Sequence, residues 1–133
     1  MSEKLFNINS FSKKKKLLFI ILVVSVALII CLPFILRAVV SFGNWHEINE
    51  INGVAEASSG KTKFYSNGNW IESFGDNSGH DGEWEILSDF TFVYDDGYDV
   101  TYYNCGDWFY IGTDLFLGDD YHFSRLPFLY PGD

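Results

Sequence analysis

An uncharged apolar segment near the N-terminus limits what this chain can fold into more than any other feature. The segment runs from Leu17 to Leu36 and reads LLFIILVVSVALIICLPFIL. At about 1.5 Å per residue, an α-helix of this length extends roughly 30 Å, the thickness of the hydrocarbon core of a bilayer. The rest of the chain is too short to cover such a helix on every side. The sequence therefore predicts a transmembrane helix within residues 17–42.

The charges that flank this segment predict its orientation. Four lysines stand directly before it, at Lys13, Lys14, Lys15 and Lys16. Only Arg37 follows closely, so the positive-inside rule places residues 1–16 in the cytoplasm and the C-terminal half outside. Trp45 falls where an aromatic anchor at the membrane interface is expected. Pro33 comes late enough to bend only the last turn.

A cleaved signal peptide remains an alternative, because it has the same order of basic and apolar residues. Signal peptides usually have a shorter apolar region, and the small residues at Ser41 and Gly43 make a weak cleavage site. A lipoprotein signal requires small residues before the cysteine, but bulky Ile29 and Ile30 precede Cys31. A pilin-type N-terminus is excluded because its glycine and glutamate are missing. A retained anchor is the favoured interpretation.

Charge is divided unevenly along the chain. Residues 1–42 contain six basic residues and one acid, a net charge of +5, whereas residues 43–133 contain three basic residues and seventeen acids, a net charge of −14. Phosphate binding requires a positive surface, so the acidic half is a poor nucleic-acid partner. The two cysteines, Cys31 and Cys105, lie on different sides of the predicted membrane boundary, and no disulfide framework is expected. We expect Cys105 to be a half-buried free thiol.

The stretch after the apolar segment is predicted to connect it to a folded domain. Trp45, Ile48 and Ile51 recur at helical spacing, which allows a short juxtamembrane helix. The sequence Ala57-Ser58-Ser59-Gly60 is typical of a linker. We therefore assign residues 43–62 to a juxtamembrane linker and residues 63–133 to an extracytoplasmic domain.

The domain is predicted to be mainly β. Asn67-Gly68 indicates a two-residue hairpin turn in which both residues have positive φ. The glycine-rich residues 75–82 are expected to form a flexible loop. Beyond them, residues with high β propensity alternate and are separated by Asp and Gly turns, which predicts about eight short strands between Phe64 and Ser124. Such an antiparallel meander is expected to form a small barrel or a strongly curved sheet.

The segment GEWEI…FTFVYDDGYDVTYY…DWFYIGTDLFLGDDYHFSR, within residues 82–125, resembles lipocalin-like small barrels of bacterial membrane-anchored surface proteins. The matching positions are Gly82, Trp84, Asp96, Gly97, Ile111, Asp114, Leu115, Leu117, Phe123 and Arg125. The resemblance implies a small barrel topology. The strands are shorter than those of a full eight-stranded barrel, which leaves a ligand-holding interior open to question.

Catalytic and metal-binding signals are weak in this sequence. His46, His80 and His122 lack the spacing of metal ligands, and we expect His122 to face solvent. The acidic clusters at residues 76–83 and 95–99 favour turns over a calcium site, because they do not match a calcium-loop pattern. No nucleophile motif or phosphate loop is present. We therefore expect neither a cofactor nor an enzymatic activity.

The aromatic residues are the remaining indication of function. The chain contains four tryptophans and eight tyrosines, more than a small core requires. Trp84 and Trp108 are expected to fill the core, while Trp70 and Tyr103 are candidates for an exposed ligand-binding site. The sequence thus favours a membrane-anchored binding module whose partner is a protein, a glycan or a small apolar molecule outside the cell. The alternative is an accessory subunit that acts through its transmembrane helix.

Overall fold

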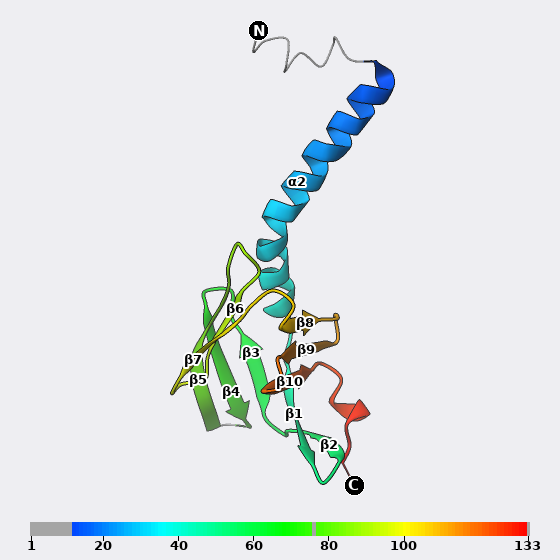
Figure 1. Ribbon diagram of the computed structural model, residues 1–133. Helices are drawn as coiled ribbons and strands as arrows, with labels where there is room; N and C mark the ends of the chain where they lie inside the picture. Colours follow the sequence, from blue (N-terminus) through cyan, green and yellow to red (C-terminus); the bar gives the residue numbers. More distant parts are fainter. Residues whose placement is uncertain (1–11, 76, 133) are drawn as a thin grey trace. The chain divides into compact units, whose positions relative to one another are not determined.

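The computed structural model describes residues 12–75 and 77–132, and the chain divides into two units, Met1–Leu32 and Pro33–Asp133 (Figure 1). The elements in chain order are α2 (Lys13–Val40), β1 (His46–Ile51), β2 (Val54–Ala57), β3 (Lys61–Phe64), β4 (Asn69–Phe74), β5 (Asn77–Ile86), β6 (Phe92–Asp95), β7 (Val100–Tyr103), β8 (Trp108–Tyr110), β9 (Asp114–Leu117), β10 (Tyr121–Ser124) and η2 (Pro127–Leu129).

The predicted apolar helix is confirmed, and it is longer than the apolar segment. Helix α2 includes the lysines before the segment, and the Ser12 side chain accepts a hydrogen bond from the Lys15 backbone amide at 3.3 Å. The helix is long and apolar enough to cross a membrane. Its last turns, from Pro33 onward, belong to the second unit. The part of the predicted cytoplasmic tail in residues 1–11 lies outside the described residues.

The second unit contains two antiparallel five-stranded sheets. The first has the order β2-β1-β10-β9-β8, and the second has the order β3-β4-β5-β6-β7. An isolated bridge between Trp45 and Thr62 links them. The mainly β prediction is confirmed. Over the described residues the sheets do not form a closed barrel. The eight strands expected between Phe64 and Ser124 correspond to β3–β10, and β1 and β2 are additional strands that precede them.

Strands β1 and β2 lie where a juxtamembrane helix and linker were expected. They pair as a hairpin through Asn52 and Gly53, which have φ values of 54° and 80°. Positive φ at both residues is the requirement of the tight turn that we predicted at Asn67-Gly68. At that second site only Gly68 has positive φ, and its amide bonds to Tyr65 O, which gives a longer turn. The spacing of Trp45, Ile48 and Ile51 suggested a helix because β1 is only six residues long, too short for the alternation of a strand to stand out.

The predicted glycine-rich loop is instead part of β5, the longest strand. A Cβ atom added at Gly60 or Gly79 would lie 2.6 Å from the Phe74 ring, and one added at Gly82 would lie 2.6 Å from the Trp70 indole. Aromatic rings from β4 therefore cover the glycines and supply the packing that they lack. The glycine-rich part of β5 has no alternation of apolar residues in the sequence, because the apolar surface that covers it belongs to Phe74 and Trp70 of β4.

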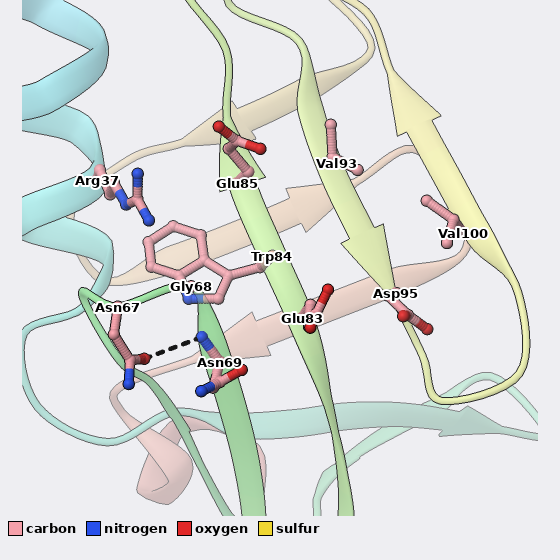
Figure 2. Close-up of a pocket in the computed structure, with 10 residues that line it drawn as sticks. All are labelled: Arg37, Asn67, Gly68, Asn69, Glu83, Trp84, Glu85, Val93, Asp95 and Val100. Carbon is pink, nitrogen blue, oxygen red and sulfur yellow. Dashed lines mark hydrogen bonds between the residues drawn. The ribbon is translucent and has the colours of Figure 1, made fainter.

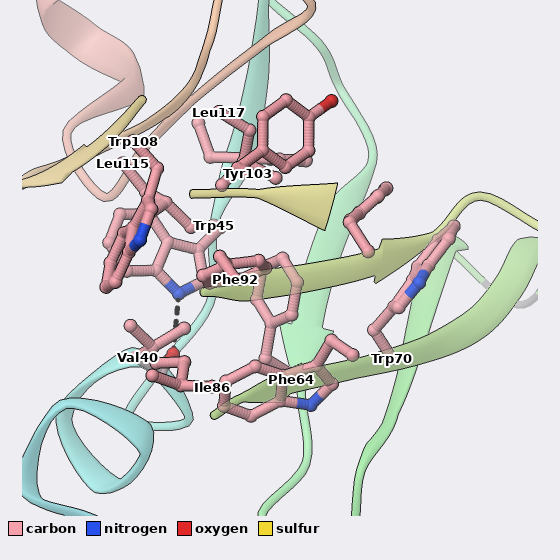
Figure 3. Packing of buried hydrophobic residues seen from close by; sticks show 13 residues of the cluster. Val40, Trp45, Phe64, Trp70, Ile86, Phe92, Tyr103, Trp108, Leu115 and Leu117 are labelled. Carbon is pink, nitrogen blue, oxygen red and sulfur yellow. Dashed lines mark hydrogen bonds between the residues drawn. The ribbon is translucent and has the colours of Figure 1, made fainter. Parts of the chain in front are cut away.

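The core lies between the two sheets and is dominated by aromatic residues (Figure 3). All four indole N–H groups donate to backbone carbonyls in other segments: Trp45 to Val40 (2.8 Å), Trp70 to Asp95 (2.7 Å), Trp84 to Tyr65 (2.9 Å) and Trp108 to Phe90 (2.7 Å). Each ring thus buries a large apolar area while its polar group is satisfied. The core assignments of Trp84 and Trp108 are confirmed.

Trp45 is not the interfacial anchor that we predicted. Its side chain is fully buried, and its indole donates to the carbonyl of Val40 at the end of α2 (Figure 3). Val40 is also fully buried and belongs to the same core cluster as residues of both sheets. Leu36 packs against this cluster. The end of the helix is therefore part of the domain core.

The carboxyl end of α2 is capped completely by the domain. Its last four carbonyl groups, which have no partner inside a helix, all accept hydrogen bonds from Ser41, Phe42, Trp45 or Arg125. Arg125, which follows β10, donates to the carbonyls of Val39, Phe42 and Gly112. Its guanidinium also lies 4.1 Å from the centre of the Trp45 ring. A positive charge here complements the negative end of the helix dipole.

Replacing Arg125 by methionine tests this cap. We expect the free energy of unfolding to fall by about 2–4 kcal/mol, because three backbone carbonyls lose a charged donor and a cation–π contact is lost. Chemical denaturation of the full chain in lipid nanodiscs, followed by tryptophan fluorescence, measures the change. Lys61→Met on an exposed position is the matched control and should change stability by less than about 0.5 kcal/mol. Equal effects of the two substitutions would contradict the proposed cap.

Candidate functional site

A cleft of about 210 Å³ opens where the inner faces of the two sheets separate. Residues from both sheets line it: Glu47, Thr62, Trp70, Glu72, His80, Tyr94, Asp96, Tyr98, Tyr121 and Phe123. Strand alternation explains the arrangement, because Trp70 and Glu72 occupy inward positions of β4, and Tyr94 lies inward on β6. We call this the acidic cleft.

Aromatic rings form the wall of the acidic cleft. Trp70 and Tyr94 are stacked with centroids 5.4 Å apart and planes at 13°, and Tyr121 lies 4.7 Å from Tyr94. The Trp70 ring also lies over Gly82, and only 4% of this residue is exposed. Trp70 therefore has no open ring face to offer a ligand.

Glu72 is the most unusual residue in the acidic cleft. It is only 8% exposed, yet among the described residues it accepts no hydrogen bond and forms no ion pair. Gly79 leaves room for it, because a Cβ atom there would lie 2.9 Å from Glu72 Oε1. Its carboxylate oxygens are not completely buried, so the side chain is enclosed while the carboxylate opens into the cleft.

Glu47 faces the same space from the other sheet. Burial raises the pKa of its carboxyl, the charge of Glu72 raises it further, and His80 opposes both effects. The two glutamates therefore repel each other in a partly desolvated space. This repulsion destabilises the ligand-free cleft, and a bound positive charge would remove it.

The rim of the acidic cleft is held by the turn between β6 and β7. Asp96 accepts hydrogen bonds from the amides of Tyr98 and Asp99 at 2.8 Å each, and from the Tyr121 hydroxyl at 3.2 Å. The amides of Asp99 and Tyr98 lower the pKa of Asp96, while burial and the charge of Asp96 raise the pKa of Tyr121 to about 12. Burial likewise raises the pKa of Tyr94. Both phenols are therefore neutral near pH 7.

The side chains that line the acidic cleft provide negative charge and hydrogen-bond acceptors. Among the described residues, no group of three or more His, Cys, Asp or Glu is arranged to hold a metal ion. Thr62 pairs with Glu72 on the neighbouring strand. Among the described residues no histidine forms a hydrogen bond with Thr62, so its hydroxyl has no base to activate it as a nucleophile. The cleft thus combines carboxylates, neutral hydroxyls and aromatic edges.

The two residues predicted to bind a ligand lie in different places. Trp70 lines the acidic cleft, but it is buried, not exposed as we expected. Tyr103 is 5% exposed, packs under Gly118 and donates to Asp120 at 2.8 Å. The sequence analysis missed Glu47 and Glu72. An acid on the same face of a strand as a buried tryptophan was the available signal for Glu72.

His122 does not face solvent as predicted. It stacks on Phe116 with centroids 4.3 Å apart, and its Nε2 lies 2.7 Å from the buried carboxylate of Asp114. Ser124 and Tyr130 also donate to Asp114, at 3.0 and 2.7 Å. The serine bonds to the aspartate and not to the histidine, which is the wrong order for a nucleophilic triad. The cluster attaches the C-terminal segment to β9 and β10.

A second hollow lies beside the turn between β3 and β4 (Figure 2). It measures about 310 Å³ and is lined by Arg37, Glu83, Trp84 and others, with the Arg37 guanidinium 5.8 Å from the Trp84 ring centre. Its carboxylates at Glu83 and Glu85 are exposed to solvent. These two carboxylates are therefore less enclosed than Glu72.

Cys105 is a free, exposed cysteine, and not the half-buried thiol that we expected. It lies in the turn between β7 and β8. Cys31 is also free and exposed on α2.

Comparison with models of known families finds no match, and no curated protein or solved structure is significantly similar to the chain. The resemblance to lipocalin-like domains thus stays a prediction from the sequence pattern. The functional argument rests on the geometry of the acidic cleft.

Replacing Glu47 by glutamine tests the repulsion in the acidic cleft. Because the folded protein raises the pKa of Glu47, its ionised form opposes folding above that pKa, and the opposition disappears as the pH falls through it. We expect E47Q to raise the Tm at pH 7 by roughly 2–4 °C, a modest value for a partly solvated group.

At pH 4 the advantage of E47Q should be largely lost. Thermal unfolding at both pH values, followed by circular dichroism, measures it. Glu85→Gln, at an exposed position outside the acidic cleft, is the control and should leave the Tm unchanged. A lower Tm for E47Q at pH 7 would show that the glutamate stabilises the fold.

Proposed function

We propose that the chain is a single-pass membrane protein that presents an extracytoplasmic binding domain, with the acidic cleft as the binding site. Helix α2 supplies the membrane anchor, and the four lysines at its start favour a cytoplasmic N-terminus. The strongly acidic composition of residues 43–133 suits a domain that does not adhere to an anionic membrane surface. The partner is a molecule or protein outside the cytoplasm.

The packing of the helix end supports a retained anchor over a cleaved signal peptide. Cleavage near Ser41 or Gly43 would remove Val40 from the core and deprive the Trp45 indole of its acceptor. It would also remove the Val39 carbonyl to which Arg125 donates. Cleavage would therefore remove part of the domain core, which favours a chain that keeps its helix.

The same packing supports an earlier end of the membrane-embedded segment than Leu36. Pro33 is buried, and Pro33, Phe34 and Arg37 share a hollow with Leu87 and Asp89. A carboxylate is expensive in hydrocarbon, so we propose that the embedded segment runs from Leu17 to Leu32. This segment is about 24 Å long as a helix, which a slightly thinned bilayer accommodates.

One observation carries the proposal of a binding function: Glu72 is buried in an open cleft without a compensating partner among the described residues. Its side chain is enclosed by the domain, and its carboxylate opens into the cleft with no donor in the described part of the chain. A catalytic role is not favoured, because the cleft provides no activated nucleophile. We therefore propose ligand binding as the role of Glu72.

The topology and the retention of the anchor are tested together. A membrane-impermeant maleimide should label the exposed Cys105 in intact cells that express the full chain. Intact-mass spectrometry should show a chain that still contains α2. C105S is the control for labelling at Cys31. Labelling that requires cell lysis would overturn the orientation, and a mature chain beginning near residue 43 would overturn the anchor.

Binding at the acidic cleft is tested by photo-crosslinking in cells. Tyr98 lines the rim and is 84% exposed, so a photoreactive phenylalanine there should form an adduct with the bound partner. Intact-mass spectrometry detects small adducts, and gel electrophoresis detects protein adducts. Phe128, which is 72% exposed outside the cleft, is the matched control position. Identical adducts from both positions, or none from Tyr98, would contradict the proposal.

The accessory-subunit alternative predicts a different dependence. Replacing residues 17–32 with an unrelated transmembrane helix should leave the Tyr98 adduct intact if the acidic cleft binds the partner. Loss of the adduct in a folded, membrane-inserted variant would favour the helix as the interacting element.

A further inference from the structure

We propose that the ligand of the acidic cleft is an alkylammonium group, a primary ammonium on a short apolar stem, held between Glu47 and Glu72. This inference rests on the binding function proposed above and names the chemical class of its ligand. The group has two possible sources, a free amine or the side chain of a lysine in a partner protein.

Charge selects a cation. The charged or titratable groups that face the acidic cleft are Glu47, Glu72, His80, Asp96 and the phenols of Tyr94, Tyr98 and Tyr121. Three of them are carboxylates, and the nearest side chain that can carry positive charge is His80 on the rim. An anion would meet repulsion from every buried charge, whereas a cation would relieve the repulsion between Glu47 and Glu72.

The identity of the acceptors favours an ammonium group. An ammonium has three hydrogen-bond donors and no acceptor. The acidic cleft offers acceptors from separate elements: Glu47 on β1, Glu72 on β4 and the hydroxyl of Thr62 on β3. A compact ammonium can donate in three directions at once, which suits acceptors that lie on three separate strands, whereas the donors of a guanidinium lie in one plane.

The shape of the acidic cleft argues against a sugar. Sugar rings bind on open aromatic faces, but Trp70 lies between Gly82 and Tyr94 and is nearly fully buried. The volume of about 210 Å³ equals that of about seven water molecules. n-Butylammonium has five non-hydrogen atoms and matches a lysine side chain, so it fits this space with its stem against the aromatic wall.

The four indole N–H groups provide internal reporters for a test. Trp70 donates to Asp95 O at the acidic cleft, whereas Trp108 donates to Phe90 O elsewhere in the core. In ¹H–¹⁵N spectra of the full chain in nanodiscs, n-butylammonium should shift the Trp70 indole resonance saturably and leave that of Trp108 unchanged. n-Butanol, the uncharged analogue, and butyrate should have no effect at the same concentrations.

Variants assign the effect to the proposed residues. Glu72→Gln should weaken n-butylammonium binding at least about tenfold, because the charge-assisted hydrogen bond is lost. E47Q should weaken it as well. E85Q is the matched control and should bind like the native chain. The circular dichroism of each variant establishes that it is folded.

The two sources of the ammonium are separated by a second titration. A tripeptide with a central lysine and blocked ends should bind more tightly than n-butylammonium if a partner protein supplies the group. Weaker binding of the peptide would identify a free amine as the ligand. The same peptide with central arginine should bind more weakly than the lysine form.

The outcomes distinguish the ligand class from the binding function. Equal shifts with n-butanol, tighter binding of the arginine peptide, or undiminished binding to E72Q would overturn the ammonium assignment. If a neutral saccharide shifts the Trp70 resonance and competes for the Tyr98 adduct, the binding function stands and the ligand class is wrong. If no probe moves the Trp70 resonance and Tyr98 forms no adduct, both proposals fail.

Binding should also depend on pH in a defined direction. Only the ionised carboxylates attract the ammonium, and the pKa of Glu47 is raised by burial. The affinity should therefore fall as the pH is lowered from 7 through that raised pKa. His80 also faces the cleft, and the His80→Gln variant tests whether the pH dependence belongs to the glutamates. An affinity that rises on acidification would contradict the role of Glu47.

Discussion

The hydrogen bonds at the carboxyl end of α2 hold the last turns of the helix, from Pro33 onward, in the β domain. Arg125 follows the last strand, yet it donates to carbonyls at the end of the first helix and at Gly112. Trp45 completes the cap by donating to Val40. The bonds from Arg125 to Val39 and Phe42 connect residues more than eighty positions apart, so they tie the two ends of the domain together. The sheets that line the acidic cleft depend on this junction, because Trp45 also bridges to Thr62.

In contrast to the helix end, the acidic cleft contains charged groups, Glu47 and Glu72, that form no stabilising hydrogen bond or ion pair in the described part of the chain. The core around it is well satisfied: every indole donates to a carbonyl, and Asp114 accepts hydrogen bonds from three side chains. Glu47 and Glu72 accept no side-chain hydrogen bond in the described part of the chain, and their carboxylates open into the cleft, whereas the fully buried atoms without a partner are Arg37 Nε and Arg125 Nε. Natural proteins are only slightly more stable than folding requires. Repulsion between two carboxylates lowers that stability, so its retention indicates that the carboxylates have a use. This contrast is the physical reason for placing function in the acidic cleft.

Sequence reasoning predicted the features that depend on local composition. The apolar helix and the strands from Phe92 to Ser124 follow from hydrophobic length and alternation, and the structure contains them. It failed where a residue's environment comes from elsewhere in the chain. Trp45 looked like a membrane anchor because its acceptor and its cation, Val40 and Arg125, become neighbours only on folding. The glycines of β5 resembled a loop because Phe74 and Trp70 cover them from another strand.

The candidate site was predicted only in part, for the same reason. Trp70 was selected as an aromatic residue, but its role as a buried wall depends on its stacking with Tyr94. Glu47 lay in the presumed linker, and its approach to Glu72 requires two sheets to meet. No spacing rule reports a contact between strands of different sheets.

The most direct test of the central claim, that a cation relieves the repulsion in the acidic cleft, is the pKa of Glu47 measured with and without ligand. Carboxyl ¹³C titration of the full chain in nanodiscs provides this value. We expect a pKa above the ordinary glutamate value in the free protein, and a fall of that pKa when n-butylammonium saturates the cleft. An ordinary pKa in the free protein, or one that does not change at saturating amine, would contradict the account.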